Sequence, residues 1–232
     1  MGAAPATRNP HPGAHRAADL AVARGAETHR RILETAVEVA AREGLEGLTI
    51  GKLAAATAMS KAGLFQHFGS KEELQVATVA AAREIFIDRA MRPALKLAPG
   101  LPRLRALCEH WLAYSRTSGG GCFFAEASAE FDGRPGPVRD RIAGTMKEWL
   151  AALERAVAEA QQLGHLRRDA EPAQVAYELN ALELASNWAR QLLRDRRAVG
   201  RSQAAMMGLL VRLATAEGLR ILRGGPPVRG GS

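Results

Sequence analysis

The sequence is poor in aromatic residues and lacks long apolar runs. Only 5% of its 232 residues are aromatic although 47% are hydrophobic, so the interior must consist mostly of Leu, Ala and Val. Few segments alternate apolar and polar residues in the way that β-strands do, and the composition therefore favours helices. No run approaches the ~18 apolar residues that a membrane-spanning helix requires, which argues against an integral membrane protein.

Cysteine is scarce, and what there is forms no metal-binding pattern. Cys108 and Cys122 are the two cysteines, and neither belongs to a CxxC pair or to a Cys/His spacing typical of a metal site. We expect no metal and no cofactor, and a reducing cytoplasm is the expected compartment. Cys122 has no basic neighbour in the sequence that would lower its pKa. It is interpreted as a small buried hydrophobe, with a redox-sensing thiol as the alternative.

Sequence signatures of enzymes are also missing. The chain contains no GxSxG, HExxH, P-loop or dinucleotide-binding fingerprint. His110 lies two residues from Cys108, which places the two side chains on different sides of a helix and excludes a simple catalytic dyad. No catalytic residue is therefore nominated, and the chain is not expected to be an enzyme.

The net charge of +8 is concentrated at one end of the chain. Residues 1–89 hold 11 basic and 10 acidic side chains, and residues 90–189 hold 12 of each. Residues 190–232 hold nine arginines against Asp195 and Glu217. The global charge thus supports solubility and a weak attraction to polyanions, but it does not locate a nucleic-acid site.

Proline, glycine and capping residues divide the chain into four parts. Residues 1–27 are rich in Pro, Gly, Ala and His without the apolar core of a signal peptide, and are expected to form a disordered tail. Residues 28–89 form a first helical domain, and prolines from Pro93 onward mark a boundary. Residues 90–223 form a larger domain, and 224–232 a flexible tail. Five helices are expected in the larger domain, near 101–117, 121–131, 137–163, 172–196 and 202–222.

The first domain has the signals of a helix-turn-helix. Its helices are preceded by the capping residues Thr28, Thr49, Ser60 and Ser70. Gly44 is expected to end the first helix in the left-handed conformation, and Glu73 completes a capping box that opens a helix running to about Arg89. The two middle helices are short and are joined by three residues, which is the spacing of a helix-turn-helix motif.

The second short helix, "KAGLFQHF", has the composition of a helix that reads DNA. One face is expected to pack on the helices behind it through Met59, Leu64 and Phe68. The other face carries Lys61, Ala62, Gly63, Phe65, Gln66 and His67. Small side chains let the backbone approach base edges, while Lys and Gln can hydrogen-bond to bases and an aromatic ring can touch a thymine methyl group.

Lys71 and several residues of this helix also have ordinary structural interpretations. Lys71, in the first turn of the following helix, combines its charge with free backbone N–H groups and so offers a phosphate-binding position; the alternative is a solvated surface charge. The same alternative holds for Lys61. His67 is either a phosphate contact or a histidine packed between helices, and Phe65 either faces the groove or replaces Leu64 in the core.

The segment from Thr28 to Leu74 resembles the TetR family of bacterial transcriptional regulators. The matching residues are Ile32-Leu33, Gly44, Thr49, Leu53-Ala54, Ser60, Gly63-Leu64, His67-Phe68 and Ser70-Lys71-Glu72. The resemblance implies an all-α, homodimeric protein with an N-terminal helix-turn-helix domain and a larger C-terminal ligand-binding and dimerisation domain. It implies contacts to double-stranded operator DNA from Thr49, Ser60, Lys61, Ala62, Gly63, Phe65, Gln66, His67 and Lys71. Beyond residue 75 it rests only on helix number and length.

Three residues depart from the family pattern. Ala58 stands where a glycine is usual, which predicts a turn without a left-handed residue. Phe65 replaces the usual tyrosine and removes a hydroxyl group that often contacts phosphate. Gly51 stands where a longer, groove-facing side chain can occur. These departures bear on the operator sequence and not on the fold.

Aromatic and polar residues in the C-terminal half suggest an effector pocket. Pocket walls combine apolar side chains with a few polar groups, and that mixture occurs at Trp111, Phe123, Phe124, Glu126, Trp149, Asn187 and Trp188. Glu183 falls on the same apolar stretch. The alternative is an ordinary core with polar edges.

Apolar stripes on the last two expected helices predict a dimer interface. The first stripe consists of Val175, Leu179, Leu182, Trp188 and Leu192, and the second of Met207, Leu210, Ala214 and Gly218. Two such helices packed on their twofold mates form a four-helix bundle. The sequence therefore predicts a repressor that binds a palindromic operator and is released by a small, mostly apolar effector. The alternatives are an activator of the same family and a helical interaction module without a DNA role.

Overall fold

The computed structural model describes residues 12–117 and 119–224 and is all-α over these residues. The helices are α1 (Pro12–Glu43), α2 (Ile50–Thr57), α3 (Lys61–Phe68), α4 (Lys71–Phe86), α5 (Arg92–Leu95), α6 (Leu101–Thr117), α7 (Phe123–Phe131), α8 (Pro137–Gln162), α9 (Pro172–Gln191), α10 (Ala198–Leu213) and α11 (Ala216–Leu222). The all-α fold class expected from the sequence is confirmed.

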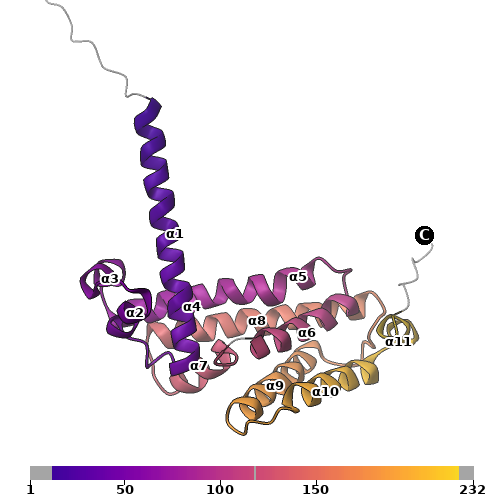
Figure 1. Cartoon of the computed structure of the whole chain (residues 1–232). Helices are drawn as coiled ribbons and strands as arrows, with labels where there is room; N and C mark the ends of the chain where they lie inside the picture. The colour runs from indigo at the N-terminus through magenta and orange to yellow at the C-terminus, as the bar shows by residue number, and fades with distance from the viewer. Residues whose placement is uncertain (1–11, 118, 225–232) are drawn as a thin grey trace, which may run out of the picture.

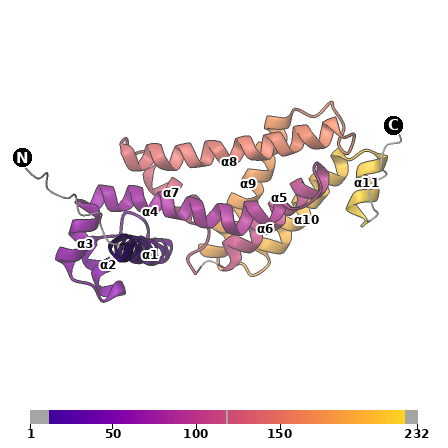
Figure 2. The same ribbon diagram turned by 90° about the horizontal axis from the view of Figure 1, so that it is seen from above.

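The helices form an elongated body with α2 and α3 at one end and α11 at the other (Figure 1, Figure 2). Between these ends α4 packs on α8, and α6 also packs on α8. The pair formed by α9 and α10 lies along one side of the body, where α9 contacts α8 and α10 contacts α6 (Figure 1). Helix α4 therefore connects the end that carries the short helices to the centre of the larger helical part.

Helix α1 is longer than the sequence indicated. It begins at Pro12 and projects beyond the body (Figure 1), so the prediction of a disordered tail through residue 27 is wrong for residues 12–27. Proline is favoured in the first turn of a helix, and the Ala- and Leu-rich residues 17–24 are strong helix formers. The rest of the expected tail, residues 1–11, and residues 225–232 of the C-terminal tail lie outside the described residues.

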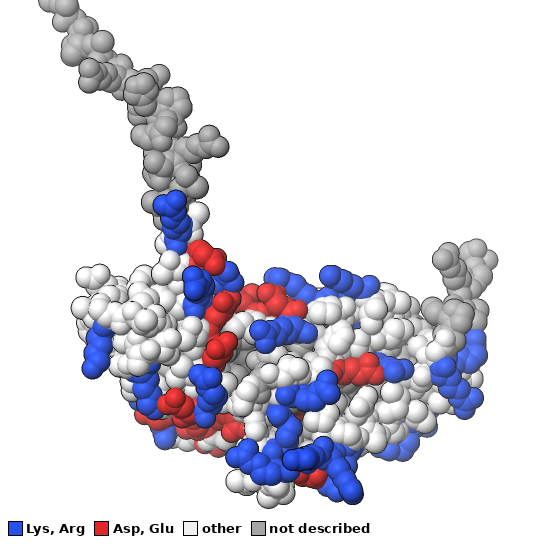
Figure 3. Space-filling view, in the orientation of Figure 1, with Lys and Arg blue, Asp and Glu red and all other residues white. Residues whose placement is uncertain are grey.

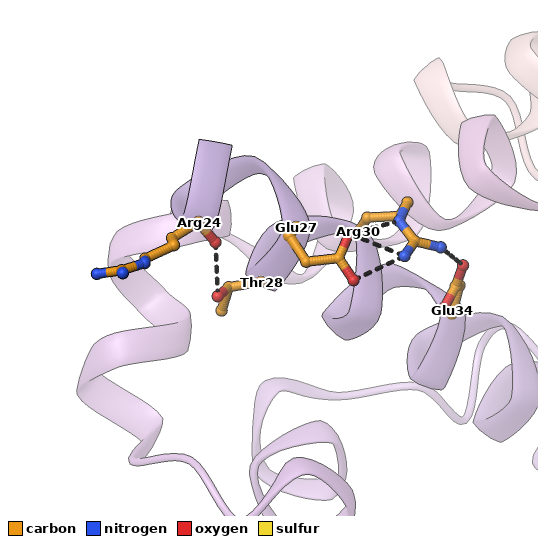
Figure 4. A network of polar contacts seen from close by, with 5 residues as sticks. All are labelled: Arg24, Glu27, Thr28, Arg30 and Glu34. Atoms are coloured by element: carbon orange, nitrogen blue, oxygen red, sulfur yellow. Dashed lines mark hydrogen bonds and ion pairs between the residues drawn. The ribbon is translucent and has the colours of Figure 1, made fainter. Parts of the chain in front are cut away.

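Because α1 begins earlier, Thr28 does not cap it. The hydroxyl group of Thr28 lies within the helix and donates to the carbonyl oxygen of Arg24 at 2.9 Å (Figure 4). Nearby, the guanidinium group of Arg30 bonds to the carboxylates of Glu27 and Glu34 one turn away on either side. The exposed part of α1 is thus held by hydrogen bonds and ion pairs along its own surface.

The helix that starts at Ser70 continues past the expected end at Arg89. After α4 the chain forms a π-helical turn, η1 (Ile87–Met91), and then α5. Pro93 does not break the path, because it lies in the first turn of α5, where a missing N–H group leaves no helical bond unmade. Wider turns of this kind occur mostly as single interruptions of helices and are frequent at functional sites.

The expected helix 202–222 is two helices, α10 and α11. The chain is extended at Ala214 (ψ 143°), and the hydroxyl group of Thr215 accepts a hydrogen bond from the Gly218 N–H at 3.1 Å. Thr215 is thus an N-cap, and N-cap threonine starts a new helix in preference to continuing an old one. The other expected boundary in this region also moves, because α9 ends at Gln191 and not at residue 196.

The turn between α2 and α3 contains a left-handed alanine. Ala58 has φ 54° and ψ 27°, so the expectation of a turn without a left-handed residue is wrong. Here the geometry of the turn overrides the preference of the residue, because a side chain with a Cβ atom is destabilised in this conformation by about 1–2 kcal/mol. Gly44, by contrast, has φ 82° directly after α1, as the sequence predicted.

Replacement of Ala58 with glycine should therefore stabilise the protein. Glycine adopts the left-handed conformation without steric cost, and we expect a gain of about 1 kcal/mol in the free energy of unfolding. For a chain of this size that corresponds to a rise of roughly 2–4 °C in the melting temperature. Calorimetry of Ala58→Gly tests this, with Ala62→Gly in the interior of α3 as the control that should lower the melting temperature. A lower melting temperature for Ala58→Gly would contradict the account of the turn.

Candidate functional site

Three hydroxyl groups fix the ends of the short helices. Thr49 accepts a hydrogen bond from the Lys52 N–H at 3.2 Å, and Ser60 accepts one from the Gly63 N–H at 3.0 Å. Ser70 begins α4 in the same way, with the Glu73 N–H at 3.0 Å. The N-caps predicted at these positions are confirmed. Thr49 and Ser60, both expected at the DNA interface, therefore also define where α2 and α3 begin.

Helix α3 has one buried face and one exposed face. Leu64 is fully buried and Phe68 is 4% exposed, whereas the Phe65 side chain is 57% exposed. The alternative that Phe65 replaces Leu64 in the core is thereby excluded. Lys61, Ala62, Gln66 and His67 are also exposed, and Gly63 is half-buried. The structure thus brings together on one surface the residues of α3 that the sequence nominated.

His67 and Lys61 have neighbours that shape this surface. The His67 ring is exposed and lies 5.7 Å from the ring of His29 on α1, so His67 is not packed inside between helices. The Lys61 side chain lies over Gly51, with its Cε atom 3.5 Å from the position that a Cβ atom of residue 51 would occupy. The glycine on α2 therefore leaves room for the lysine at the start of α3.

Lys71 is held by an ion pair beside this surface. Its ammonium group lies 2.8 Å from a carboxylate oxygen of Glu46, which also accepts from Gln75 and pairs with Arg134. The hydrogen bond from Lys71 is the main cause that lowers the pKa of Glu46. Since Lys71 and Glu46 are both about half exposed, the pair is weak, and the lysine remains available to a stronger anion.

Positive charge does not gather on the α2–α3 end of the molecule. In the view of Figure 3, Lys and Arg side chains are spread along the body, with groups at its lower edge and at the end near the C-terminus. The turn between α9 and α10 contributes Arg194, Arg196 and Arg197, all exposed. The excess charge thus lies where the sequence placed it, away from α3.

Helix α7 ties the α1–α2 turn to the rest of the protein. The Glu130 carboxylate accepts hydrogen bonds from the backbone N–H groups of Leu45 (3.1 Å) and Glu46 (2.7 Å). At the other end of α7 the Asn187 side chain accepts from the Cys122 N–H (2.8 Å) and donates to Glu126 (2.7 Å). Sequence reasoning did not find Glu130, because its partners are more than 80 residues away and no local pattern signals the contact.

The expected pocket aromatics form a packed cluster. The rings of Trp111 and Trp149 lie 4.7 Å apart at 71°, and Phe86 of α4 lies 5.1 Å from Trp149 and 6.2 Å from Phe124. These edge-to-face contacts are the favourable arrangement of aromatic pairs. Phe123 lies beside Phe124, with ring centroids 5.2 Å apart. Trp188, in contrast, is 56% exposed and does not join the cluster.

A groove of about 360 Å³ opens beside this cluster, between α4–η1 and α8. Phe86 and Trp149 form its inner wall, and it is also lined by Arg83, Ile87, Met91, Thr145, Glu148, Ala151 and Arg155. Its volume is within the range of small-molecule sites, which are mostly apolar with a few polar groups. Of the nominated ligand-binding residues, Trp149 is the one that lines this groove.

Titratable groups lie buried at the junction of α6, α7 and α9. Burial raises the pKa of the Cys122 and Cys108 thiols to about 12 each, so both remain protonated and a redox-sensing thiolate is not supported. Glu183 is completely buried, and burial raises the pKa of its carboxyl group to about 7.

Metal and membrane sites are not found in the part of the chain that the structure describes. No group of three or more His, Cys, Asp or Glu side chains among the described residues has the arrangement of a metal site. Within the same residues, no helix combines the length and the apolar character needed to cross a bilayer.

Two family models match the chain. The first, "Bacterial regulatory proteins, tetR family", matches residues 32–78, and the second, "Tetracyclin repressor-like, C-terminal domain", matches residues 100–206. The chain is also 26% identical over 168 residues to the HTH-type transcriptional repressor DhaR of Mycobacterium sp. (strain GP1). That match covers 71% of this chain and 80% of the repressor.

Solved structures of regulators share the fold. A TetR transcriptional regulator from Chloroflexus aurantiacus J-10-FL superposes with a TM-score of 0.76 at 21% identity, covering 82% of this chain and 98% of that one. AibR, solved in complex with isovaleryl coenzyme A and operator DNA, superposes with a TM-score of 0.61 at 26% identity, covering 80% of this chain and 97% of AibR.

Proposed function

Because the chain belongs to the TetR family of bacterial regulatory proteins, we propose that it is a repressor that binds a palindromic operator as a homodimer and is released by a small, mostly apolar effector. The observation that carries the proposal is α3: an eight-residue helix anchored by Leu64 and Phe68 with its opposite face exposed. A helix of this length suffices, because the N-terminal residues of a recognition helix make the base contacts in the major groove. A regulator of transcription in a bacterium acts in the cytoplasm.

The side chains of α3 and its neighbours would divide the work of binding DNA. Lys61 and Gln66 are the candidates for base contacts, and Phe65 for contact with a thymine methyl group. Lys71 and His67 are the candidates for phosphate contacts, and Ala62 and Gly63 would allow close approach. Thr49 and Ser60 would present their helix N-termini, since free N–H groups at a helix start attract phosphate. For Lys71, binding would exchange Glu46 for phosphate.

Homodimerisation is supported by an exposed apolar face on α9. This α9 apolar face consists of Tyr177, Ala181, Leu184, Trp188 and Leu192, all exposed and spaced by three or four residues. The stripe predicted from sequence mixed two faces of the helix, because Val175 and Leu179 are buried within the chain. On α10 the exposed Val211 continues the surface, whereas Leu210 is buried. Exposed apolar patches of this kind mark interfaces.

The α9 apolar face and α10 would form a four-helix bundle with their twofold mates. The two copies of α3 would then lie about 34–36 Å apart, one turn of DNA, as a palindromic operator requires. The division proposed for the chain is a helix-turn-helix domain at 28–89 and an effector-binding and dimerisation domain at 90–223.

Release by an effector is supported by the groove beside Trp149. The groove lies against α4, which also carries Lys71 and packs on α1. A ligand that separates α4 from α8 would therefore displace α3 and change the distance between the two recognition helices. The ligand weakens operator binding only by its difference in affinity for the two states. DhaR is a repressor, and AibR was solved with both an acyl coenzyme A and operator DNA; both support ligand-responsive repression over activation.

Substitutions on α3 and α4 test the proposed DNA interface. Operator fragments are first captured from genomic DNA with the purified protein. Lys61→Ala combined with Gln66→Ala should weaken binding to the captured fragment by about 1–3 kcal/mol for each good base contact that the substitution removes. Lys71→Ala should weaken all DNA sequences alike and reduce the salt dependence by about one counterion.

Lys147→Ala, an exposed lysine on α8, is the matched control and should change neither quantity. Fluorescence anisotropy with operator and shuffled DNA measures both. Unchanged operator affinity in a folded Lys61/Gln66 double variant would refute the assignment of α3 as the recognition helix.

A further inference from the structure

Buried polar groups without partners are concentrated where α6 faces α9. Among the described residues, nine of the eleven buried side-chain atoms that lack a hydrogen bond belong to residues 110–115 of α6 or 180–191 of α9. They include the indole N–H of Trp111, the hydroxyl groups of Ser115 and Ser186, and both carboxylate oxygens of Glu183. More than 90% of buried polar groups in folded proteins are hydrogen-bonded, so this concentration is unusual.

Glu183 is the most costly member of this group. Its side chain is 0% exposed and neither of its oxygens has a hydrogen-bond partner. Ser115 and Arg190 lie near its carboxyl group, but the Arg190 guanidinium group donates to the carbonyl oxygen of Ser115 instead. An ionised carboxylate in such a place is strongly unfavourable unless a cation pairs with it.

The surroundings of Glu183 join the aromatic cluster. Cys122 lies beside both Glu183 and the Trp111 indole. Trp111 and Ser115 are one turn apart on the same face of α6, and the Trp111 ring packs against Trp149 at 4.7 Å. Trp149 in turn lines the groove between α4–η1 and α8. An apolar surface therefore leads from the groove to a buried carboxylate.

We propose that Glu183 binds the cationic group of an amphipathic ligand, an organic amine or ammonium compound, whose apolar part packs against Trp111 and Trp149. A cation recovers the cost of the buried carboxylate, which a neutral or anionic group does not, and an aromatic face adds a cation–π interaction. This inference rests on the proposed ligand-responsive function and specifies the class of its effector. Arg190 is the internal rival of the ligand for Glu183.

Three compounds with the same apolar body and different head groups test the proposal. They are 4-phenylbutylamine, 4-phenylbutan-1-ol and 4-phenylbutanoate. Their affinities for the full chain are measured by calorimetry at pH 8, where the amine is charged. We expect the amine to bind at least about tenfold more tightly than the alcohol, because one ion pair in a buried site is worth a tenfold change or more. The carboxylate should bind most weakly.

The variant Glu183→Gln keeps the shape of the side chain and removes its charge. It should bind the amine and the alcohol equally, within about twofold, while Glu178→Gln on the same helix keeps the preference of the wild type. The proposal is overturned if the wild type binds the amine no more tightly than the alcohol, if none of the three binds, or if Glu183→Gln retains the preference. The comparison of compounds on the wild type needs no variant to fold.

Operator binding in the presence of each compound separates this proposal from the proposed function. If the carboxylate binds best and releases the operator, the cationic class is wrong and ligand-responsive repression stands. If the amine binds through Glu183 and leaves operator affinity unchanged, the site is confirmed and release by this class of effector is wrong.

Discussion

Replacement of Trp188 with aspartate will produce a monomer and weaken operator binding by about 10²–10⁴-fold. Trp188 lies at 56% exposure in the α9 apolar face, where a twofold mate would cover it. A charge there would have to be buried without a partner in the dimer, at a cost of several kcal/mol. A monomer holds one half-site only, and linking two binding modules typically raises affinity by 10²–10⁴ even though the interface itself is unchanged.

Leu163→Asp is the matched control for this experiment. Leu163 is a similarly exposed apolar residue (50%), but it follows α8 and lies outside the α9 apolar face. Light scattering measures the mass of each variant, and anisotropy measures operator affinity. A dimeric Trp188→Asp protein, or a wild type that is monomeric at micromolar concentration, would show that this face is not the interface.

Wild-type protein will lose stability as the pH rises from 5 to 8, and Glu183→Gln will lack that loss. Burial raises the pKa of Glu183 from 4.5 to about 7 in the folded chain. Between these values the folded state binds more protons than the unfolded state, so the free energy of unfolding falls as the pH rises. The loss begins near pH 4.5 and is complete above pH 7. At 1.36 kcal/mol for each pH unit it amounts to about 3 kcal/mol.

The comparison between the two proteins isolates Glu183 from other titrating groups. His165 acts in the opposite direction, because burial lowers its pKa and its neutral form is favoured as the pH rises. Its effect is the same in the wild type and in Glu183→Gln, and cancels in the difference. Urea titrations at pH 5 and pH 8 measure that difference, with Glu178→Gln as the control. A difference that does not change with pH would mean that Glu183 is paired in solution.

Local signals in the sequence predicted the helix-turn-helix well. Ser60 and Ser70 cap α3 and α4 as expected because N-capping involves only residues within one turn. The buried and exposed faces of α3 also followed from residue spacing alone. The exposed surface nominated for DNA contact could therefore be predicted before the structure was known.

Features that depend on distant contacts could not be predicted in this way. The left-handed conformation of Ala58 is imposed by the packing of α2 and α3 and runs against the preference of the residue. The contact of Glu130 with the α1–α2 turn joins segments more than 80 residues apart. Spacing also could not separate the two faces of α9, since apolar residues occur on both. Trp188 was for that reason assigned to the pocket and lies instead on the exposed face.

The most direct test of DNA recognition by α3 is the affinity of the wild-type protein for its captured operator compared with a shuffled fragment of equal length. We expect a preference of at least about 10³ for the operator at physiological salt, which is the low end for specific DNA-binding proteins. We also expect both affinities to fall as salt is raised. Equal affinity for the two fragments would contradict the claim that α3 reads a DNA sequence.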